Sequence, residues 1–388
     1  MKTFDVIMVN MSSYAEWQRG TSNRNYHVLR ELAHDSRVGK ILAVDYPPLT
    51  IKRGIRNYME NIFPTLSGGS VLTFGAADKL TKLGDKLFVY TNSAFFLSPD
   101  RFIKRLKAMA HICGLSDYLL WSFFPPVMEY TQTLGQKLTV FDAVDNWIEH
   151  PSYVKFKERL KRNYQYVKQH SDVIFTVAQD LMRLFDNQPN VYWIPNGVEL
   201  SHYQSKHILI NRDIANIPKP IVGYIGVIQE RVDTELIVQL ASKNPTKSFV
   251  LVGPVWREED KKTLARASNI FLLGYKSYDE APAYIQQFDV AMIPHRRSTF
   301  IESTNPMKMY EYLACGKPVV ATRESGAALF NEFVYLADDA EDFNRKLYHA
   351  LQEDSPEKQK ARRAAVEEHS WQNVVKQMLD IIEKKMGY

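Results

Sequence analysis

Two oppositely charged side chains, Lys308 and Glu311, lie about one helical turn apart in the stretch of residues 305–322. Lys308 falls in the first turn of an expected helix, where a cation opposes the helix dipole, and lysine before glutamate is not the favoured order for a helical ion pair. An anion bound at the start of this helix would account for the lysine, and a phosphate is the obvious candidate. The alternatives are a solvated Lys308 and a surface ion pair between Lys308 and Glu311.

The ends of this helix are expected from its flanking residues. Asn305 is a suitable N-cap, and Pro306 suits the first helical position. Gly316, followed by Pro318, ends the helix. The apolar run that comes next predicts a buried strand, so the charged first turn belongs to a short element with defined ends.

Strand-like apolar runs alternate with helical patterns along most of the chain, which argues for parallel sheets built from βαβ units. We expect strands at residues 4–9, 40–44, 87–90, 118–122, 137–141, 173–177 and 191–194, and at residues 221–224, 248–252, 270–272, 290–293, 318–321 and 333–336. The fold class is therefore α/β, with two Rossmann-like doubly wound domains facing a cleft. Ligands of open parallel sheets bind beyond the carboxyl ends of the strands, so we expect the active site in that cleft.

The length of 388 residues favours two domains over one ordinary core. Regular patterning stops after residue 197, and Pro218 and Pro220 punctuate the chain before it resumes. We expect a first Rossmann-like domain over residues 1–198, an interdomain linker over 199–219, a second Rossmann-like domain over 220–365 and a C-terminal helix over 366–388. Packing of that helix on the first domain is one option.

The composition is that of a globular chain, with 45% hydrophobic and 24% charged residues. The two cysteines, Cys113 and Cys315, are far apart and lack metal-ligand spacing, which favours a reducing compartment over a disulfide scaffold. Residues 1–10 suit a first buried strand better than a signal peptide, and no apolar run reaches the roughly 18 residues of a membrane span. We therefore expect a cytoplasmic protein.

The net charge of +5 is modest, but its positive residues are concentrated in the first half of the chain. Residues 155–168 hold six lysines and arginines against one acid, Glu158, and apolar residues are interleaved with them. Such a basic amphipathic pattern could lie on an anionic membrane surface, which predicts a peripheral protein on the inner face of the cell membrane. The alternative is a solvated helix face; nucleic acid is not expected as a partner, because no recognition motif is present.

Several motifs of the second half resemble those of the GT-B fold glycosyltransferases, especially the family 4 type that uses nucleotide sugars. They occupy residues 194–198, 222–226, 251–254, 289–294 and 305–322. The variant Asn-Pro-Met-Lys-x-x-Glu is similar to that of bacterial polysaccharide transferases of the teichuronic acid and xanthan types. The resemblance implies a GT-B fold with the nucleotide sugar in the C-terminal domain and the acceptor in the N-terminal domain.

The chain departs from the usual donor motif of family 4, which is a glutamate, seven intervening residues and a second glutamate. Glu311 matches the second glutamate, but Ser303 stands at the first position and Glu302 is one residue away. Because the first glutamate is associated with the transferred sugar, this departure leaves open whether the reaction retains or inverts the anomeric configuration.

The resemblance also implies which residues bind the donor. In the xanthan-type relatives a Met-Lys pair of this helix contacts the donor, so Met307 and Lys308 are expected to do so here, with Lys308 meeting a phosphate or a sugar carboxylate. Tyr275 matches the position where the family cradles the nucleotide base, and packing of the domain is its alternative. The expected donor-binding residues are Gly226, Arg231, Tyr275, Ser303, Thr304, Met307, Lys308 and Glu311. Alternatives are an exposed loop position for the arginine and helix capping for the serine and threonine.

Glycosyl transfer also needs an activated acceptor hydroxyl, commonly through a carboxylate or a histidine. Asp142 and Asp145 follow a strongly apolar expected strand, and the resemblance implies that an aspartate in this region acts as the base. Asp145 is the first choice and Asp142 the second, with capping or turn formation as the alternative for both. Lys308 completes the expected catalytic set, because a cation stabilises the charge that develops on the leaving β-phosphate.

Three histidines are further candidates near the chemistry. His27 could border the acceptor, with a structural role as its alternative, and His150 and His295 are additional candidates. No cluster of His, Asp and Glu has metal-ligand spacing, so we expect neither a metal nor a cofactor, the nucleotide sugar being a substrate.

These features together predict a metal-independent glycosyltransferase of cell-envelope polysaccharide synthesis. The expected donor is a UDP-sugar, with UDP-glucuronate as a refinement that depends on Lys308, and the expected acceptor is a lipid-linked saccharide or a cell-surface polysaccharide. One alternative is a nucleotide-sugar epimerase on the same fold. The other is a catalytically inactive transferase-like partner protein, for which Ser303 in place of a glutamate is the best argument.

Overall fold

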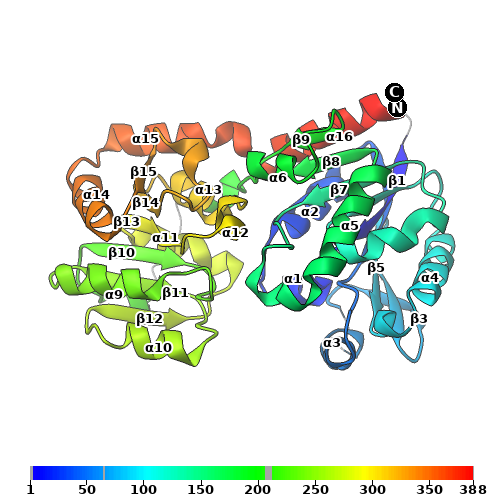
Figure 1. Cartoon of the computed structure of the whole chain (residues 1–388), viewed down its shortest axis with the longest axis horizontal. Helices are drawn as coiled ribbons and strands as arrows, with labels where there is room; N and C mark the ends of the chain where they lie inside the picture. The colour runs from blue at the N-terminus through cyan, green and yellow to red at the C-terminus, as the bar shows by residue number, and fades with distance from the viewer. Residues whose placement is uncertain (1–2, 64–65, 206–211, 388) are drawn as a thin grey trace. The chain divides into compact units, whose positions relative to one another are not determined.

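The computed structural model describes residues 3–63, 66–205 and 212–387 and has the α/β fold class expected from the sequence (Figure 1). The chain divides into unit 1, residues Met1–Ile194 with Val375–Tyr388, and unit 2, residues Pro195–Val374. Helix α16 (Trp371–Met386) begins in unit 2 and continues in unit 1. The expected linker, 199–219, falls in unit 2 and contains α7 (Leu200–Tyr203) and α8 (Arg212–Ala215); its residues 206–211 lie outside the described residues.

Unit 1 contains a nine-stranded sheet in the order β3-β4-β5-β2-β1-β6-β7-β8-β9. The strands are β1 (Phe4–Val9), β2 (Val38–Val44), β3 (Ser70–Phe74), β4 (Asp78–Leu83), β5 (Leu87–Asn92), β6 (Leu119–Ser122), β7 (Thr139–Ala143), β8 (Val173–Thr176) and β9 (Val191–Trp193). The strands from β5 to β9 in this order pair in parallel, whereas β3 and β4 form an antiparallel extension. The seven strands expected here are therefore confirmed, and the sequence missed β3 and β4.

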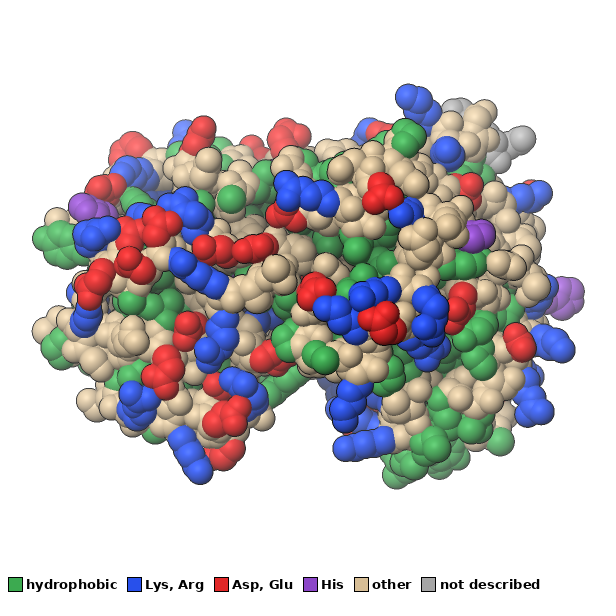
Figure 2. Space-filling model, viewed as in Figure 1, with side chains coloured by type: hydrophobic (Ala, Val, Ile, Leu, Met, Phe, Trp, Pro, Cys, Tyr) green, Lys and Arg blue, Asp and Glu red, His purple; other side chains and the backbone are tan. Residues whose placement is uncertain are grey.

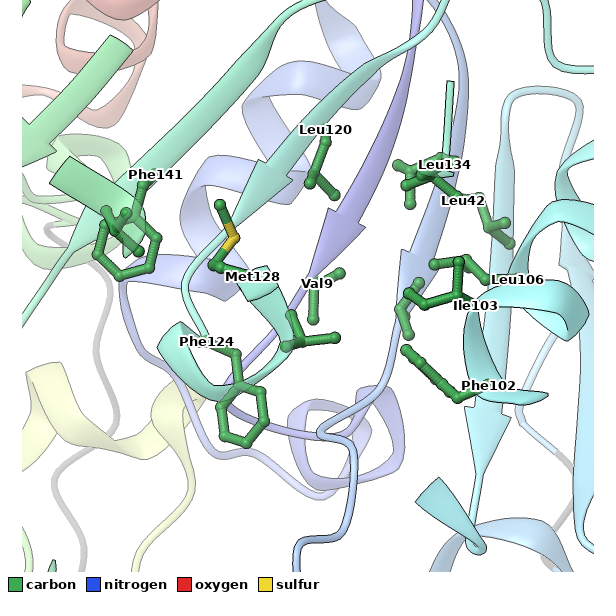
Figure 3. Close-up of a cluster of buried hydrophobic side chains, with 14 of the residues drawn as sticks. Val9, Leu42, Phe102, Ile103, Leu106, Leu120, Phe124, Met128, Leu134 and Phe141 are labelled. Carbon is green, nitrogen blue, oxygen red and sulfur yellow. The ribbon is translucent and has the colours of Figure 1, made fainter. Parts of the chain in front are cut away.

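The core of unit 1 combines side chains of the central strands with those of its longer helices. Figure 3 shows Val9, Leu120 and Phe141 on three neighbouring strands, together with Phe102 and Leu106 of α4, all of them buried. The helices are α1 (Tyr14–Gln18), α2 (Arg24–His34), α3 (Ile51–Asn57), η1 (Tyr58–Ile62), η2 (Phe95–Leu97), α4 (Pro99–Ile112), η3 (Pro125–Thr133), η4 (Pro151–Phe156), α5 (Lys157–His170) and α6 (Gln179–Arg183).

Helix α5 contains most of the basic amphipathic pattern noted in the sequence. Its apolar residues Leu160, Tyr164 and Val167 are buried in the core of unit 1. The apolar side of this helix therefore packs in the core, and only its charged side could contact a membrane surface. None of the helices that the structure describes is long and apolar enough to cross a membrane.

Unit 2 contains a six-stranded parallel sheet in the order β12-β11-β10-β13-β14-β15. The strands are β10 (Ile221–Ile225), β11 (Ser248–Val252), β12 (Ile270–Gly274), β13 (Val290–Ile293), β14 (Val319–Thr322) and β15 (Val334–Ala337). All six expected strands are confirmed. The order reverses between β10 and β13, and the carboxyl ends of strands at such a switch point are where open α/β sheets bind ligands.

Helices connect the strands of unit 2 in the βαβ manner expected from the sequence. They are α9 (Thr234–Lys243), α10 (Glu258–Leu264), η5 (Tyr278–Glu280), α11 (Ala281–Gln287), α12 (Thr299–Glu302), α13 (Met307–Ala314), η6 (Ala328–Phe330), α14 (Ala340–Gln352), α15 (Pro356–Ala365) and η7 (Glu367–His369). The close packing of helix and sheet is clearest at Gly223 in β10, where a Cβ would lie 2.1 Å from the ring of Phe288.

Helix α13 differs at its start from the expectation. Pro306 occupies the N-cap position, and no side chain caps the helix. The prediction of Asn305 as the cap was wrong, because its Oδ1 instead accepts hydrogen bonds from the Asn196 backbone N–H and the Tyr310 hydroxyl, both at 2.9 Å. The first-turn N–H groups of α13 are thus left without a capping side chain.

A buried ion pair links α2 to the sheet of unit 1. The Nε of Arg24 lies 3.0 Å from both carboxylate oxygens of Asp142 in β7, and its Nη2 donates to the Ile194 carbonyl at 3.1 Å. Arg24 is 3% exposed and Asp142 is fully buried. Asp142 therefore has a structural partner inside the unit.

We expect Arg24→Met to lower the free energy of unfolding by about 3–5 kcal/mol, because it leaves the Asp142 carboxylate buried without its counter-charge. Urea unfolding followed by tryptophan fluorescence measures this loss. The matched control, Arg183→Met, breaks an exposed ion pair with Asp180 on α6 and should change the free energy by less than about 1 kcal/mol. Equal losses in the two variants would contradict a stabilising role for the buried pair.

Candidate functional site

The loops that follow β10 and β13 are held against each other at the switch point of unit 2. Val232 and His295 form an antiparallel bridge. On either side of it, the Arg296 N–H donates to the Arg231 carbonyl at 2.9 Å, and the Asp233 N–H donates to the Pro294 carbonyl at 2.8 Å. Two segments that are about 60 residues apart are thereby fixed side by side at the carboxyl ends of adjacent strands.

The first turn of α13 reaches the same place. The Nζ of Lys308 lies 5.1 Å from the centroid of the Tyr224 ring, over its face. Gly226, directly after β10, has a φ of 131°, and a Cβ there would lie 3.3 Å from Cε of Lys308. Glycine is therefore needed at 226 both for the backbone conformation and for space beside the lysine.

Burial and neighbouring charges shift the pKa values of Lys308 and Glu311. The pKa of Lys308 is lowered, first by burial and then by the charge of Arg231, while Glu311 opposes the shift. The pKa of Glu311 is raised by burial, against the effects of Lys308 and of a hydrogen bond from the Tyr203 hydroxyl. Arg231 itself lies over the ring of Phe300, with 5.4 Å between its guanidinium carbon and the ring centroid.

His295 is a buried polar group of this cluster, and the sequence made it only an additional candidate. It is 2% exposed, and neither ring nitrogen has a hydrogen-bond partner in the described structure. Burial, Lys308 and Arg231 hold its pKa well below the usual range, so the ring is neutral at pH 7, with one N–H donor and one acceptor. An unsatisfied buried polar group costs about 1–3 kcal/mol, which a bound ligand would recover.

A second buried polar atom without a partner, Oγ of Ser325, lies in the loop after β14. The neighbouring Gly326 is pressed against the chain just before α13, since a Cβ at 326 would lie 2.1 Å from the Thr304 carbonyl oxygen. The Thr322 hydroxyl at the end of β14 donates to the His295 carbonyl at 3.0 Å. The loop after β14 thus lies at the same site as the loops after β10 and β13.

The remaining expected donor residues divide into near and distant positions. Met307 is half-buried at the start of α13, beside Lys308. The hydroxyls of Ser303 and Thr304 both donate at 2.7 Å to the backbone, to the carbonyls of Phe300 and Ile301, so their protons are not available to a phosphate. Tyr275 follows the edge strand β12, two strands from β10, and is 55% exposed. Its contact with a base stays a prediction.

The residues expected on the acceptor side lie in unit 1, and the two aspartates differ in burial. Asp142 is fully buried on Arg24, and burial raises its pKa while Arg24 lowers it. Asp145 lies in a bend after β7, half-buried, and its backbone carbonyl accepts a hydrogen bond from the Tyr164 hydroxyl at 2.9 Å. His27 is 1% exposed in α2, against the ring of Tyr26.

Sequence reasoning missed two polar residues at the carboxyl ends of neighbouring strands. Asn10 follows β1, is fully buried, and has no hydrogen-bond partner for either side-chain polar atom in the described structure. Asp45 follows β2, and burial raises its pKa to about 7 although it accepts from the Tyr14 N–H at 2.7 Å. The signal was available: each is a polar residue directly after a buried apolar strand.

In the described part of the chain, no group of three or more His, Cys, Asp or Glu side chains could hold a metal ion. The positive groups that the structure brings together in unit 2 are the side chains of Lys308 and Arg231 and the backbone N–H groups at the uncapped start of α13. Together they form a site suited to a multiply charged anion at the start of α13.

Anion binding at this site should depend on the protonation of Lys308. Sulfate keeps its charge at neutral and alkaline pH, so we expect it to raise the melting temperature of the protein at about pH 7. This effect should be lost near about pH 9.5, because the pKa of Lys308 is lowered and the side chain has lost its proton there. Thermal-shift titrations measure the effect. Lys308→Met should abolish both the gain and its pH dependence, whereas Lys262→Met, an exposed lysine of α10, should preserve both. A sulfate gain independent of pH in the native protein would contradict this role.

Comparison with proteins of known sequence adds to this geometry. Residues 231–380 match the model of a family described as glycosyl transferase-like. A Bacillus subtilis (strain 168) protein named as the teichuronic acid biosynthesis glycosyltransferase TuaH is 26% identical over 232 residues, which cover 56% of this chain and 58% of that protein. The match thus spans little more than half the length of this relative.

Two solved structures resemble nearly the whole chain. The Anabaena protein HepE, in complex with UDP and glucose, has a TM-score of 0.66 at 15% identity, covering 97% of this chain and 99% of its own. A sucrose-phosphate synthase from Thermosynechococcus elongatus has a TM-score of 0.69 at 14% identity, covering 99% of both chains. The family resemblance expected from the motifs is confirmed: this chain has the fold of the GT-B glycosyltransferases, and its residues 231–380 carry the glycosyl transferase-like family pattern.

Proposed function

We propose that this protein is a glycosyltransferase that moves a sugar from a UDP-sugar donor to a lipid-linked saccharide acceptor at the cytoplasmic face of a membrane. The observation that carries the proposal is the convergence of Lys308, Arg231 and His295 at the switch point of unit 2. Cations and N–H donors at such a point suit the two phosphates of a nucleotide sugar. The matched family and the UDP in the HepE structure support the same donor class.

The donor diphosphate would lie at the start of α13, where no side chain caps the helix. Lys308 would supply the positive charge, and the neutral His295 would donate its ring N–H to a phosphate oxygen. Gly226 lets the backbone approach the same oxygens, because no Cβ stands between them. Glu311, one turn further along, has acceptor oxygens for hydroxyl groups of the ribose or the sugar.

During transfer the bond between the anomeric carbon and the β-phosphate oxygen breaks, and its electron pair stays on that oxygen. Lys308 and Arg231 stabilise the added negative charge without rearranging, because they are already held in place by the protein. The acceptor hydroxyl oxygen bonds to the anomeric carbon and gives up its proton. Asp145 of unit 1 is the proposed base, since Asp142 is occupied by Arg24.

A glucuronate donor is the finer form of the proposal. Its carboxylate adds a second negative group to the diphosphate, and the unusual density of positive charge around Lys308 would suit both. The absence of a glutamate at position 303, where family 4 enzymes commonly carry one, removes a negative side chain that would repel such a sugar.

Two other functions would give different results in an activity assay. A nucleotide-sugar epimerase on the same fold would form product without any acceptor. An inactive partner protein would bind nucleotide without turnover. The glycosyltransferase name of the Bacillus subtilis relative favours transfer over both.

The direct test incubates the purified protein with a panel of nucleotide sugars and with lipid-linked saccharide acceptors, and measures nucleotide release. We expect acceptor-dependent release of UDP, and a loss of about 10²–10³ in kcat for Lys308→Met, comparable to removing a transition-state donor. Lys262→Met is the matched control and should keep full activity. The enzyme proposal would be contradicted by the absence of both nucleotide release and saturable nucleotide binding.

Substituting the two aspartates should affect different properties of the protein. Asp145→Asn should lower kcat by about 10²–10⁴, the usual contribution of a general base, with the unfolding midpoint unchanged. Asp142→Asn should instead lower the unfolding midpoint, because it removes the counter-charge of buried Arg24. Measuring kcat and urea unfolding on both variants separates the roles. Full activity of Asp145→Asn would exclude Asp145 as the base.

A further inference from the structure

Helix α3 and its continuation η1 have the reverse of the side-chain distribution of an ordinary surface helix. Gly54, Asn57 and Asn61 are buried against unit 1. The exposed face carries Ile51, Ile55, Met59 and Phe63, each between 60% and 63% exposed. Their spacing of four residues forms one continuous apolar stripe. A surface helix of a water-soluble protein normally turns such a stripe toward the core.

Polar contacts fix this orientation from the inside. A Cβ at Gly54 would lie 2.2 Å from the Phe96 ring, so glycine allows α3 to press against η2. The Asn57 Nδ2 donates to the Asn92 carbonyl at 2.8 Å, and the amide of Asn61 donates to Asn57. Rotating the helix to bury its stripe would break these contacts and leave buried amide groups unpaired.

The apolar surface continues onto the elements beside α3. Leu97 of η2, which contacts α3, is 71% exposed, and Phe74 at the end of the edge strand β3 is 58% exposed. Leu97 and Gly75 line one depression, which joins the two elements. We use the name α3 patch for Ile51, Ile55, Met59, Phe63, Phe74 and Leu97. Figure 2 shows hydrophobic side chains gathered at the end of unit 1 where Figure 1 places α3 and β3.

Basic residues accompany the α3 patch, both on α3 itself and in the depression that Leu97 lines with Arg101 and Arg105. The segments 51–63 and 97–107 contain seven lysines and arginines against two acidic residues. The basic residues are Lys52, Arg53, Arg56, Arg101, Lys104, Arg105 and Lys107. Arg56 pairs with Glu60 and Arg105 with Asp78, which leaves a clear excess of positive charge in the two segments that carry most of the α3 patch.

This combination selects one occupant. A second copy of the chain would bring two cationic borders together across a symmetric interface, where they repel. An anionic bilayer offers apolar chains for the stripe and phosphates for the lysines and arginines. We infer that the α3 patch docks unit 1 on an anionic lipid surface, with the stripe inserted at the boundary of headgroups and acyl chains. This inference deepens the proposed function and rests on it, because the proposed acceptor is lipid-linked.

The test measures co-sedimentation of the full-length protein with vesicles of phosphatidylcholine alone or mixed with phosphatidylglycerol, without nucleotide. We expect binding to the anionic vesicles, falling at least about tenfold in Ile51→Ser/Ile55→Ser/Met59→Ser. The control is Trp256→Ser in unit 2, which removes a side chain 65% exposed outside the patch and should bind like the native protein. Lys52→Glu/Lys104→Glu should weaken binding similarly, whereas Lys161→Glu/Arg162→Glu on α5 should change it little.

Three outcomes would overturn the inference. They are unchanged vesicle binding by the triple serine variant, a larger loss from the α5 variant than from the α3 variants, and a native dimer that the serine variant converts to monomer without any lipid binding. Nucleotide binding and donor hydrolysis in solution are measured on the same variants. The serine variant should retain both, so a failure of the lipid inference remains distinct from a failure of the proposed transferase activity.

Discussion

The crowding of positive and polar groups around the first turn of α13 is the constraint on which the rest of unit 2 depends. Burial and then the charge of Arg231 lower the pKa of Lys308, and Glu311 opposes this shift. Burial, Lys308 and Arg231 lower the pKa of His295. The uncapped start of α13 and the buried, unpartnered imidazole are each unfavourable alone, whereas Gly226 adopts its positive φ without strain and leaves space beside Lys308. A bound diphosphate would satisfy both groups together, which is a reason for their occurrence at one switch point.

Much of this fold could be predicted because its parallel strands are continuous apolar runs separated by helical patterns. The strands β3 and β4 were missed because β3 is mostly exposed, β4 carries charged residues, and the two pair antiparallel at the sheet edge. Asn305 was wrongly expected to cap α13, although its residue type suited that role. Its contacts with Asn196, 109 residues away, decided its conformation, and such a partner is invisible in the local sequence.

The residues of the site also differ in how well the sequence predicts them, because some depend on local signals and others on long-range contacts. Lys308 could be found because its own helix makes it anomalous. Asp145 was ranked above Asp142, but both stand near the end of one apolar run, and the ion pair that holds Asp142 involves Arg24, which lies 118 residues earlier. The interest of His295 comes from burial without a partner, a property that only the packed structure has. Local anomalies can thus be found in a sequence, whereas long-range pairing and burial cannot.

The two basic helices of unit 1 show why a pattern of charge alone does not identify a surface. In α5 the apolar residues between the lysines are part of the core, so its cations border water. In α3 the inner face is made of Gly54 and asparagines, so its apolar residues face outward among cations. Positive charge next to buried apolar groups favours solubility, but positive charge next to exposed apolar groups favours an anionic lipid surface. A transferase with a lipid-linked acceptor would need the second arrangement in the unit that binds the acceptor, and α3 lies in unit 1, the unit proposed for that role.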